Sequence, residues 1–159
     1  MKLYVASSWR NTRQQAVVAE LRQAGFDVYD FKNPPGGTGF DWANVDPNWK
    51  QWTPQEFREG LSHPIAFNGF QSDMVALEMA DAVVLVMPCG RSAHLEAGYA
   101  LGAHKPVFIL LSMGEPELMY KMAELVCSVD ECIQKLEALE EQRFAPFATP
   151  LDARPDLPF

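Results

Sequence analysis

The sequence lacks any uninterrupted apolar run long enough to cross a membrane, and no export-type segment precedes its first expected strand. Cysteines are also scarce: Cys89, Cys127 and Cys132 are an odd number and do not have the spacing of metal ligands. The sequence therefore predicts neither a disulfide framework nor a cysteine metal site. We expect a soluble protein of the reducing cytoplasm, with no membrane partner, no metal and no cofactor.

Basic residues are outnumbered. The chain has 13 Lys and Arg against 21 Asp and Glu, which gives a formal net charge of −8. A nucleic acid polymer is held by many Lys and Arg contacts to phosphate, so we expect no nucleic acid polymer as the main partner. A small anionic ligand stays compatible with this charge, because two or three local donors are enough to bind it.

Three common catalytic motifs are absent as well. The sequence contains no Walker phosphate loop, no glycine-rich dinucleotide fingerprint, and no Ser or Cys in a nucleophile elbow. Kinase, dehydrogenase and esterase functions therefore have little support.

The most informative stretch that is present spans residues 82–111. An apolar run at 82–87 (AVVLVM) is typical of a strand buried on both faces of a parallel sheet, and 106–111 (PVFILL) is a second one. Between them, residues 93–102 have helical spacing, with Leu95, Tyr99 and Leu101 as the apolar stripe. In this βαβ unit we expect Glu96 in the first turn of the helix, ionised by the helix dipole and directed into the crevice at the carboxyl edge of the sheet.

The remaining segments extend this pattern to a single domain. Its fold class is predicted as a three-layer α/β/α sandwich, flavodoxin-like or Rossmann-like, with a five-stranded parallel sheet in the order 2-1-3-4-5. The domain is expected at 1–143, and a proline-rich tail at 144–159. Helix 64–79 offers six apolar side chains for burial: Ile65, Phe67, Phe70, Met74, Leu77 and Met79. The other expected strands are 2–6, 26–31 and 125–128, and the other expected helices are 12–24, 54–61, 115–123 and 130–142.

An insertion at 32–53 interrupts the βα pattern. It is rich in Pro and Gly and holds three of the four tryptophans, Trp42, Trp49 and Trp52. A loop of this length and composition is typical of a folded lid or an interaction surface, in which the indoles can stack on a base. The alternative is that the tryptophans only pin the loop to the body of the protein.

Polar residues follow the first and third strands. Ser7, Ser8 and Arg10 lie in the first turn, and Arg91 and Ser92 lie in the second. Such groups at helix starts suit a phosphate or sugar hydroxyls, but Ser at these positions also serves simply as a helix cap. His94 is a further candidate for lining the site. Glu96, taken alone, can be a mere dipole partner of its helix.

A family resemblance adds to this pattern. Residues 73–107 (DMVALEMADAVVLVMPCGRSAHLEAGYALGAHKPV) resemble the core of the nucleoside 2-deoxyribosyltransferase family, most specifically in Glu-x-Gly-Tyr-Ala beginning at Glu96. Residues 4–6 resemble the family's opening strand, which brings Tyr4 to the substrate site. The resemblance implies N-glycosidic chemistry with Glu96 as nucleophile on the anomeric carbon, and Asp73 in contact with the base or assisting proton transfer.

Two local features refine what the resemblance implies. Family transferases carry an acidic residue six positions before the nucleophile, where this chain has Gly90. The run from Ser8 to Arg10 resembles the branch that hydrolyses nucleoside 5′-monophosphates, in which Ser and Arg hold the phosphate. The expected substrate is therefore a small nucleotide rather than a free nucleoside, and hydrolysis and deoxyribosyl transfer both stay open.

Other functions remain to be separated. The same sheet with a catalytic Glu resembles Toll/interleukin-receptor (TIR) domain NAD hydrolases, and a nonenzymatic nucleotide-sensing module is a third possibility. Family sites are commonly completed by a neighbouring subunit, so a homodimer or larger homo-oligomer is expected.

Overall fold

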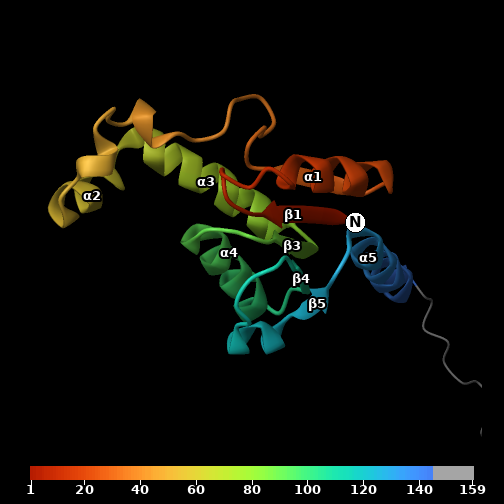
Figure 1. Ribbon diagram of the computed structural model, residues 1–159. Helices are drawn as coiled ribbons and strands as arrows, with labels where there is room; N and C mark the ends of the chain where they lie inside the picture. The colour runs from red at the N-terminus through yellow and green to blue at the C-terminus, as the bar shows by residue number, and fades with distance from the viewer. Residues whose placement is uncertain (145–159) are drawn as a thin grey trace, which may run out of the picture.

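Five short strands form one parallel sheet in the computed structural model, which describes residues 1–144 (Figure 1). Their order across the sheet is β2-β1-β3-β4-β5, and all four pairings are parallel. The predicted order 2-1-3-4-5 is confirmed. The strands are β1 (Lys2–Ala6), β2 (Asp27–Asp30), β3 (Ala82–Val86), β4 (Val107–Leu110) and β5 (Glu124–Val126).

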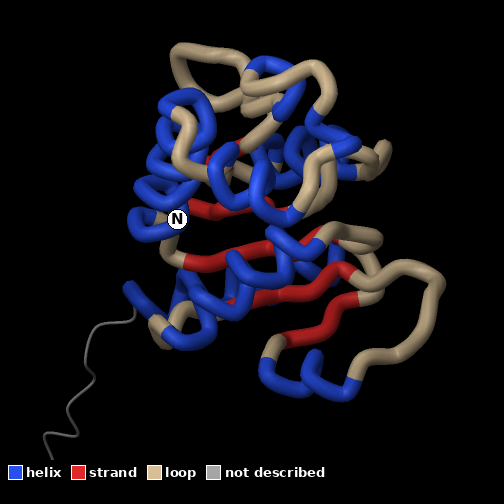
Figure 2. The backbone as a smooth tube through the Cα atoms, turned by 90° about the vertical axis from the view of Figure 1, so that its left-hand side faces the viewer, coloured by secondary structure: helices blue, strands red, loops and turns tan. Residues whose placement is uncertain are grey.

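Helices cover both faces of this sheet, which gives the predicted three layers (Figure 2). On one face, α1 (Gln14–Gln23) and α5 (Val129–Phe144) pack on side chains such as Leu3, Val5 and Val84. On the other, α3 (Pro64–Met79) and α4 (Arg91–Gly102) pack on Tyr4 and its neighbours. Successive residues of a strand point to opposite faces, so this alternation directs Tyr4 towards the α3 and α4 layer.

The side of each helix that touches the sheet differs from the expectation. In α4, the buried residues are Ala93, Ala97 and Ala100, whereas Leu95 is 75% exposed. In α3, Ala66 and Leu77 are buried, but most of the larger apolar residues predicted for burial lie in solvent, with exposures of 41% to 59%: Ile65, Phe67, Phe70 and Met79. Small residues on the inner side let each helix approach the sheet closely. Because the larger apolar residues lie on the outer side instead, both helices expose an apolar surface.

Shorter elements also depart from the predicted boundaries. The segment expected as a helix at 115–123 contains a 3-10 helix, η3 (Leu118–Met122). The last strand is expected at 125–128, whereas β5 starts one residue earlier, at Glu124, and ends two residues earlier, at Val126. No helix within residues 1–144 has both the length and the apolar character that a membrane crossing requires. The expected tail lies outside the described residues, except for Phe144 at the end of α5.

The insertion contains two 3-10 helices, η1 (Trp42–Asn44) and η2 (Trp49–Gln51), and is followed by α2 (Pro54–Gly60). Thr53 is the N-cap of α2 and forms a capping box with Glu56. This pair satisfies backbone N–H donors at the start of the helix. In Figure 1 this part of the chain, orange to yellow, lies beyond the sheet, at the amino end of α3. The insertion therefore lies beside α3 and the end of β2.

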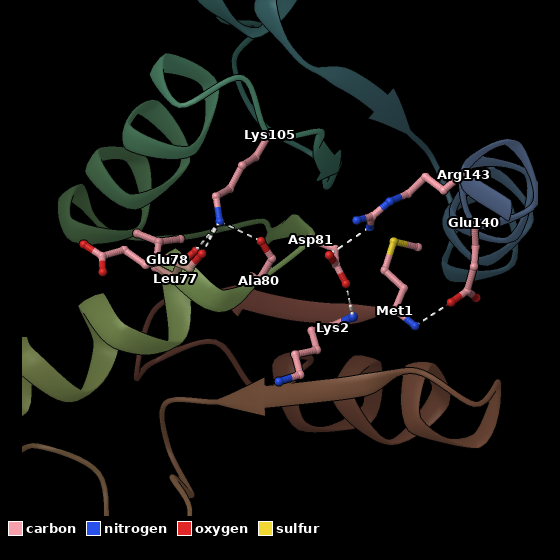
Figure 3. A network of polar contacts seen from close by, with 9 residues as sticks. All are labelled: Met1, Lys2, Leu77, Glu78, Ala80, Asp81, Lys105, Glu140 and Arg143. Carbon is pink, nitrogen blue, oxygen red and sulfur yellow. Dashed lines mark hydrogen bonds and ion pairs between the residues drawn. The ribbon is translucent and has the colours of Figure 1, made fainter.

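Lys105 holds the carboxyl end of α3 in place (Figure 3). From the connection between α4 and β4, its ammonium group donates to the backbone carbonyls of Leu77 at 3.0 Å and Ala80 at 2.7 Å, and also to that of Glu78. The last carbonyls of a helix have no partner within the helix, and a cation there also complements the helix dipole. This contact fixes α3 against the α4 layer.

Asp81 ties the same end of α3 to β1 and α5 (Figure 3). Its carboxylate accepts a hydrogen bond from the backbone N–H of Lys2 at 2.7 Å and forms an ion pair with Arg143 at 2.9 Å. The amino group of Met1 pairs with Glu140 beside it. Together these contacts fix the position of α3, which carries Asp73, relative to the sheet.

Candidate active site

Glu96 lies in the second turn of α4, because this helix begins at Arg91 with Gly90 as its N-cap. The expectation of a first-turn carboxylate that the dipole keeps ionised is wrong. The side chain is partly buried, and burial together with the charge of Asp73 raises the pKa of Glu96 to about 7. Near neutral pH this carboxyl therefore exists in both its protonated and its ionised form.

Asp73 comes from α3, on the same face of the sheet. Its Oδ1 accepts a hydrogen bond of 2.8 Å from the Tyr29 hydroxyl, which also lies 3.2 Å from the Ser72 hydroxyl. Burial raises the pKa of Asp73, and the hydrogen bond from Tyr29 offsets part of this effect. Asp73 and Glu96 are thus two partly buried carboxyls that influence one another.

Tyr4 and Tyr29 form the floor beneath these carboxyls. They are paired residues of β1 and β2, and their rings stack with 5.3 Å between centroids. The buried Tyr4 hydroxyl has no hydrogen bond of standard geometry to any residue within 1–144. It nevertheless lies close enough to Glu96 to lower the pKa of that carboxyl, while burial and the nearby negative charges raise the pKa of Tyr4. Tyr4 is therefore a neutral donor placed beside Glu96.

A cavity of about 360 Å³ opens next to this group, between the insertion and α3. Tyr29 and Asp73 line it, so they belong both to the cavity and to the group around Glu96. The remaining lining residues come from residue 31, from the insertion and from α3: Phe31, Pro34, Pro35, Gly36, Gly37, Thr38, Gly39, Phe40, Asp41, Asn44, Ile65, Asn68, Gly69 and Ser72.

The turns after β1 and β3 are joined at the carboxyl edge of the sheet. The Ser7 hydroxyl donates to the carbonyl of Val86 at 2.8 Å. The buried Asn11 amide donates to the carbonyls of Val86 and Pro88 at 3.1 and 3.0 Å. Ser7, expected to bind substrate, therefore already uses its hydroxyl proton within the protein.

The other residues expected to hold an anion lie on these two turns. The Ser8 hydroxyl accepts a hydrogen bond of 3.2 Å from the backbone N–H of Arg10, which makes it a local turn contact. Arg10, Arg91 and Ser92 are exposed, and neither arginine forms an ion pair with another residue of the described chain. Both guanidinium groups are thus available to a ligand.

His94 lies apart from the residues that line the cavity. Its Nδ1 is 2.9 Å from the carbonyl of Gly90 and its Nε2 is 2.8 Å from the Tyr120 hydroxyl. If Nδ1 donates to the carbonyl, Nε2 accepts from the tyrosine. The imidazole also stacks on the Tyr120 ring, with 5.8 Å between centroids.

The three candidate tryptophans do not line the cavity. Trp42 packs edge-on against Phe40, at 4.7 Å between centroids, and against Trp52, at 5.5 Å. The Trp52 Nε1–H donates to Asp46 at 2.6 Å, and Trp49 carries the Lys50 ammonium 5.7 Å from its ring centroid. These contacts lie within the insertion, so they favour neither expectation as stated: the indoles hold the insertion together, rather than facing a ligand or pinning the loop to the body of the protein.

Sequence reasoning did not single out Tyr29 and gave Asn11 no particular role. A signal for Tyr29 was present, because the predicted strand order pairs the second strand with the first and can place an aromatic residue next to Tyr4. For Asn11 there was none, since its amide partners are backbone carbonyls far away in the sequence. Within the described chain, no three His, Cys, Asp or Glu side chains are grouped as metal ligands.

No protein-family model matches the sequence, and no curated protein is significantly similar to it. Solved structures with a similar fold do exist. A 2-deoxyribosyltransferase from Bacillus psychrosaccharolyticus has 18% sequence identity and a TM-score of 0.56 over 84% of this chain and 90% of its own. A CMP N-glycosidase from Clostridium botulinum has 15% identity and a TM-score of 0.47 over 86% and 99%. The first likeness shows a shared fold, in agreement with the resemblance in residues 73–107.

The raised pKa of Glu96 predicts how stability depends on pH. A group whose pKa in the folded chain lies above its ordinary value contributes stability below the ordinary pKa and loses it as the pH rises through the folded value, here from 4.5 to about 7. Glu96→Gln cannot ionise. We therefore expect this variant to gain stability relative to the wild type as the pH rises from about 5 to about 8.5, as measured by urea unfolding.

The matched control is Glu137→Gln, which alters an exposed glutamate of α5. It should show no such trend. If the stability difference between Glu96→Gln and the wild type stays constant across this pH range, the fold does not raise the pKa of Glu96.

Proposed function

We propose that this protein cleaves or transfers the N-glycosidic bond of a nucleotide or nucleoside through a covalent glycosyl-Glu96 intermediate. The observation that carries the proposal is the pair of partly buried carboxyls, Glu96 and Asp73, set beside Tyr4. The fold shared with a 2-deoxyribosyltransferase adds support.

In the first step, ionised Glu96 attacks the anomeric carbon of the sugar. The carbon–nitrogen bond breaks, its electron pair goes to the leaving base, and a proton from Asp73 neutralises that base. Positive charge develops on the sugar in the transition state, and the carboxylate of Glu96 stabilises it before bonding to it. In the second step, water or the nitrogen of another base attacks the same carbon, the bond to Glu96 breaks and leaves its carboxylate, and Asp73 takes up the proton that the attacking group loses.

This reaction needs one carboxyl ionised and the other protonated. Two interacting carboxyls titrate as a pair, and in the free protein the shared proton rests on Glu96, whose pKa is raised by burial and by the charge of Asp73. The reactive form is the one in which this proton has passed to Asp73. It gives way to the fully ionised pair as the pH rises past the pKa of Glu96, about 7. Asp73 is the better placed proton donor, because it lines the cavity whereas His94 contacts Tyr120.

The turns after β1 and β3 offer a binding site for the sugar phosphate. Arg10 and Arg91 are exposed cations there, and the first turn of α4 offers free backbone N–H groups. A charge-assisted hydrogen bond from one arginine stabilises a bound phosphate by about 1.5 to 3 kcal/mol. We infer that a 5′-monophosphate is preferred to the corresponding nucleoside.

The direct test is to incubate the protein with ribo- and deoxyribonucleosides, their 5′-monophosphates and NAD, and to measure free base by chromatography. We expect base release from nucleotides, with a bell-shaped pH profile that declines above about pH 7. Glu96→Gln should lower turnover by several orders of magnitude while substrate binding persists, because the amide cannot become an anion. Glu137→Gln is again the control.

Other results from this panel would contradict the proposal in different ways. Nicotinamide released from NAD alone would identify a TIR-like hydrolase. Binding of nucleotides without any base release would identify a sensing module. Equal rates with nucleosides and nucleotides would remove the phosphate preference.

We also infer that the protein forms a homodimer or larger homo-oligomer. The outer surfaces of α3 and α4 expose Phe67, Phe70, Val75, Met79 and Leu95, each by more than half of its area. Exposed apolar surface of this kind marks a contact site, and a second copy is the occupant that the resemblance implies. Light scattering should give a multiple of the 17.8 kDa chain mass, and the monomer mass at micromolar concentration would contradict the inference.

A further inference from the structure

We propose that the cavity between the insertion and α3 selects the leaving base by its exocyclic amino group, so that amino-substituted bases are preferred to their oxo-substituted counterparts. Asp41, Asn44 and Asn68 are the selecting residues. This inference rests on the proposed function, because it assumes that the sugar lies at Glu96 and the base in the adjoining cavity.

The charge of the cavity argues for a ligand that donates hydrogen bonds. Among the described residues, its lining includes Asp41 and Asp73 but no lysine and no arginine. An anionic group such as a phosphate is disfavoured there. A neutral or cationic group with N–H donors is favoured, because carboxylates accept hydrogen bonds.

Asp41 has one carboxylate oxygen to spare. Its Oδ1 accepts a hydrogen bond of 2.9 Å from the backbone N–H of Ala43 and thereby caps η1. Its Oδ2 makes no hydrogen bond to another residue within 1–144, so it can accept one from a ligand. An aspartate acceptor opposite an amino group is the pairing by which proteins recognise cytosine.

Asn44 and Asn68 add the complementary amide groups from opposite sides. Asn44 ends η1 and Asn68 lies on α3, and both line the cavity. Neither side-chain amide is engaged with another residue of the described part. An asparagine amide can pair with both the amino group and N7 of adenine, whereas an oxo group beside N7 leaves two acceptors that one amide cannot satisfy together.

Aromatic side chains make the cavity suitable for a flat ring. Tyr29, Phe31 and Phe40 all contribute to its lining. Phe40 packs directly over Gly69 of α3, where an added Cβ would come within 3.1 Å of its side chain. The insertion is thus closely fitted to α3 at Phe40, and a base between them would be within reach of the exposed side chains of Asp41, Asn44 and Asn68.

The experiment measures binding to Glu96→Gln, in which turnover does not interfere. Calorimetry gives the dissociation constants of adenosine, inosine, cytidine and uridine 5′-monophosphates. Within each ring class, we expect the amino compound to bind about tenfold more tightly than the oxo compound. Adding Asp41→Asn keeps the helix cap but removes the charge, and should reduce this ratio at least about threefold, as should Asn68→Ala.

The control Asp130→Asn, an exposed aspartate of α5 outside the cavity, should leave the ratio unchanged. Equal binding of amino and oxo compounds, an unchanged ratio in both cavity variants, or no saturable binding at millimolar concentration would each overturn the inference. If the preference appears but the wild-type protein releases no base, the selection stands and the glycosidase proposal fails. If the wild-type protein releases base without discriminating, the selection alone fails.

Discussion

The proximity of two partly buried carboxyls, Glu96 on α4 and Asp73 on α3, is the constraint on which the proposed chemistry depends. Placing two negative charges close together away from water is unfavourable, and the protein meets this by keeping a proton on the pair near neutral pH. The surrounding structure maintains the arrangement. Tyr4 and Tyr29 lie beneath it on paired strands, and contacts of Lys105 and Asp81 at the far end of α3 hold that helix on the sheet. A change in the tilt of α3 would move Asp73 relative to Glu96.

Much of the fold could be predicted because it depends on local patterns. Unbroken apolar runs such as residues 82–87 identify buried parallel strands, and connection rules then restrict their order. The environment of Glu96 could not be read in the same way. The expected position in the first helical turn assumed a helix start at residue 93, whereas Gly90 caps the helix and α4 starts at Arg91. Burial and the charge of Asp73, which lies 23 positions earlier in the sequence, then set its pKa. Such effects arise only from three-dimensional packing.

The insertion shows a second limit of sequence reasoning. Its tryptophans are its most conspicuous residues, yet Trp42 and Trp52 pack against each other while smaller polar residues face the cavity. Large aromatic side chains stabilise an isolated loop by burying apolar area, and a loop far from the main core needs this most. Asp41 and Asn44 carry no such signal in sequence. They line the cavity only because the folded insertion lies against α3.

The central claim is that Glu96 becomes covalently bound to the sugar. The most direct measurement uses a 2-fluoro-2-deoxy sugar analogue of an accepted nucleotide, since the electron-withdrawing fluorine slows the release of the sugar from the enzyme and lets the intermediate accumulate. Peptide mass spectrometry should then find one added fluoro-sugar phosphate on Glu96, and none in Glu96→Gln. Base release without any label, or a label on another residue, would contradict the account.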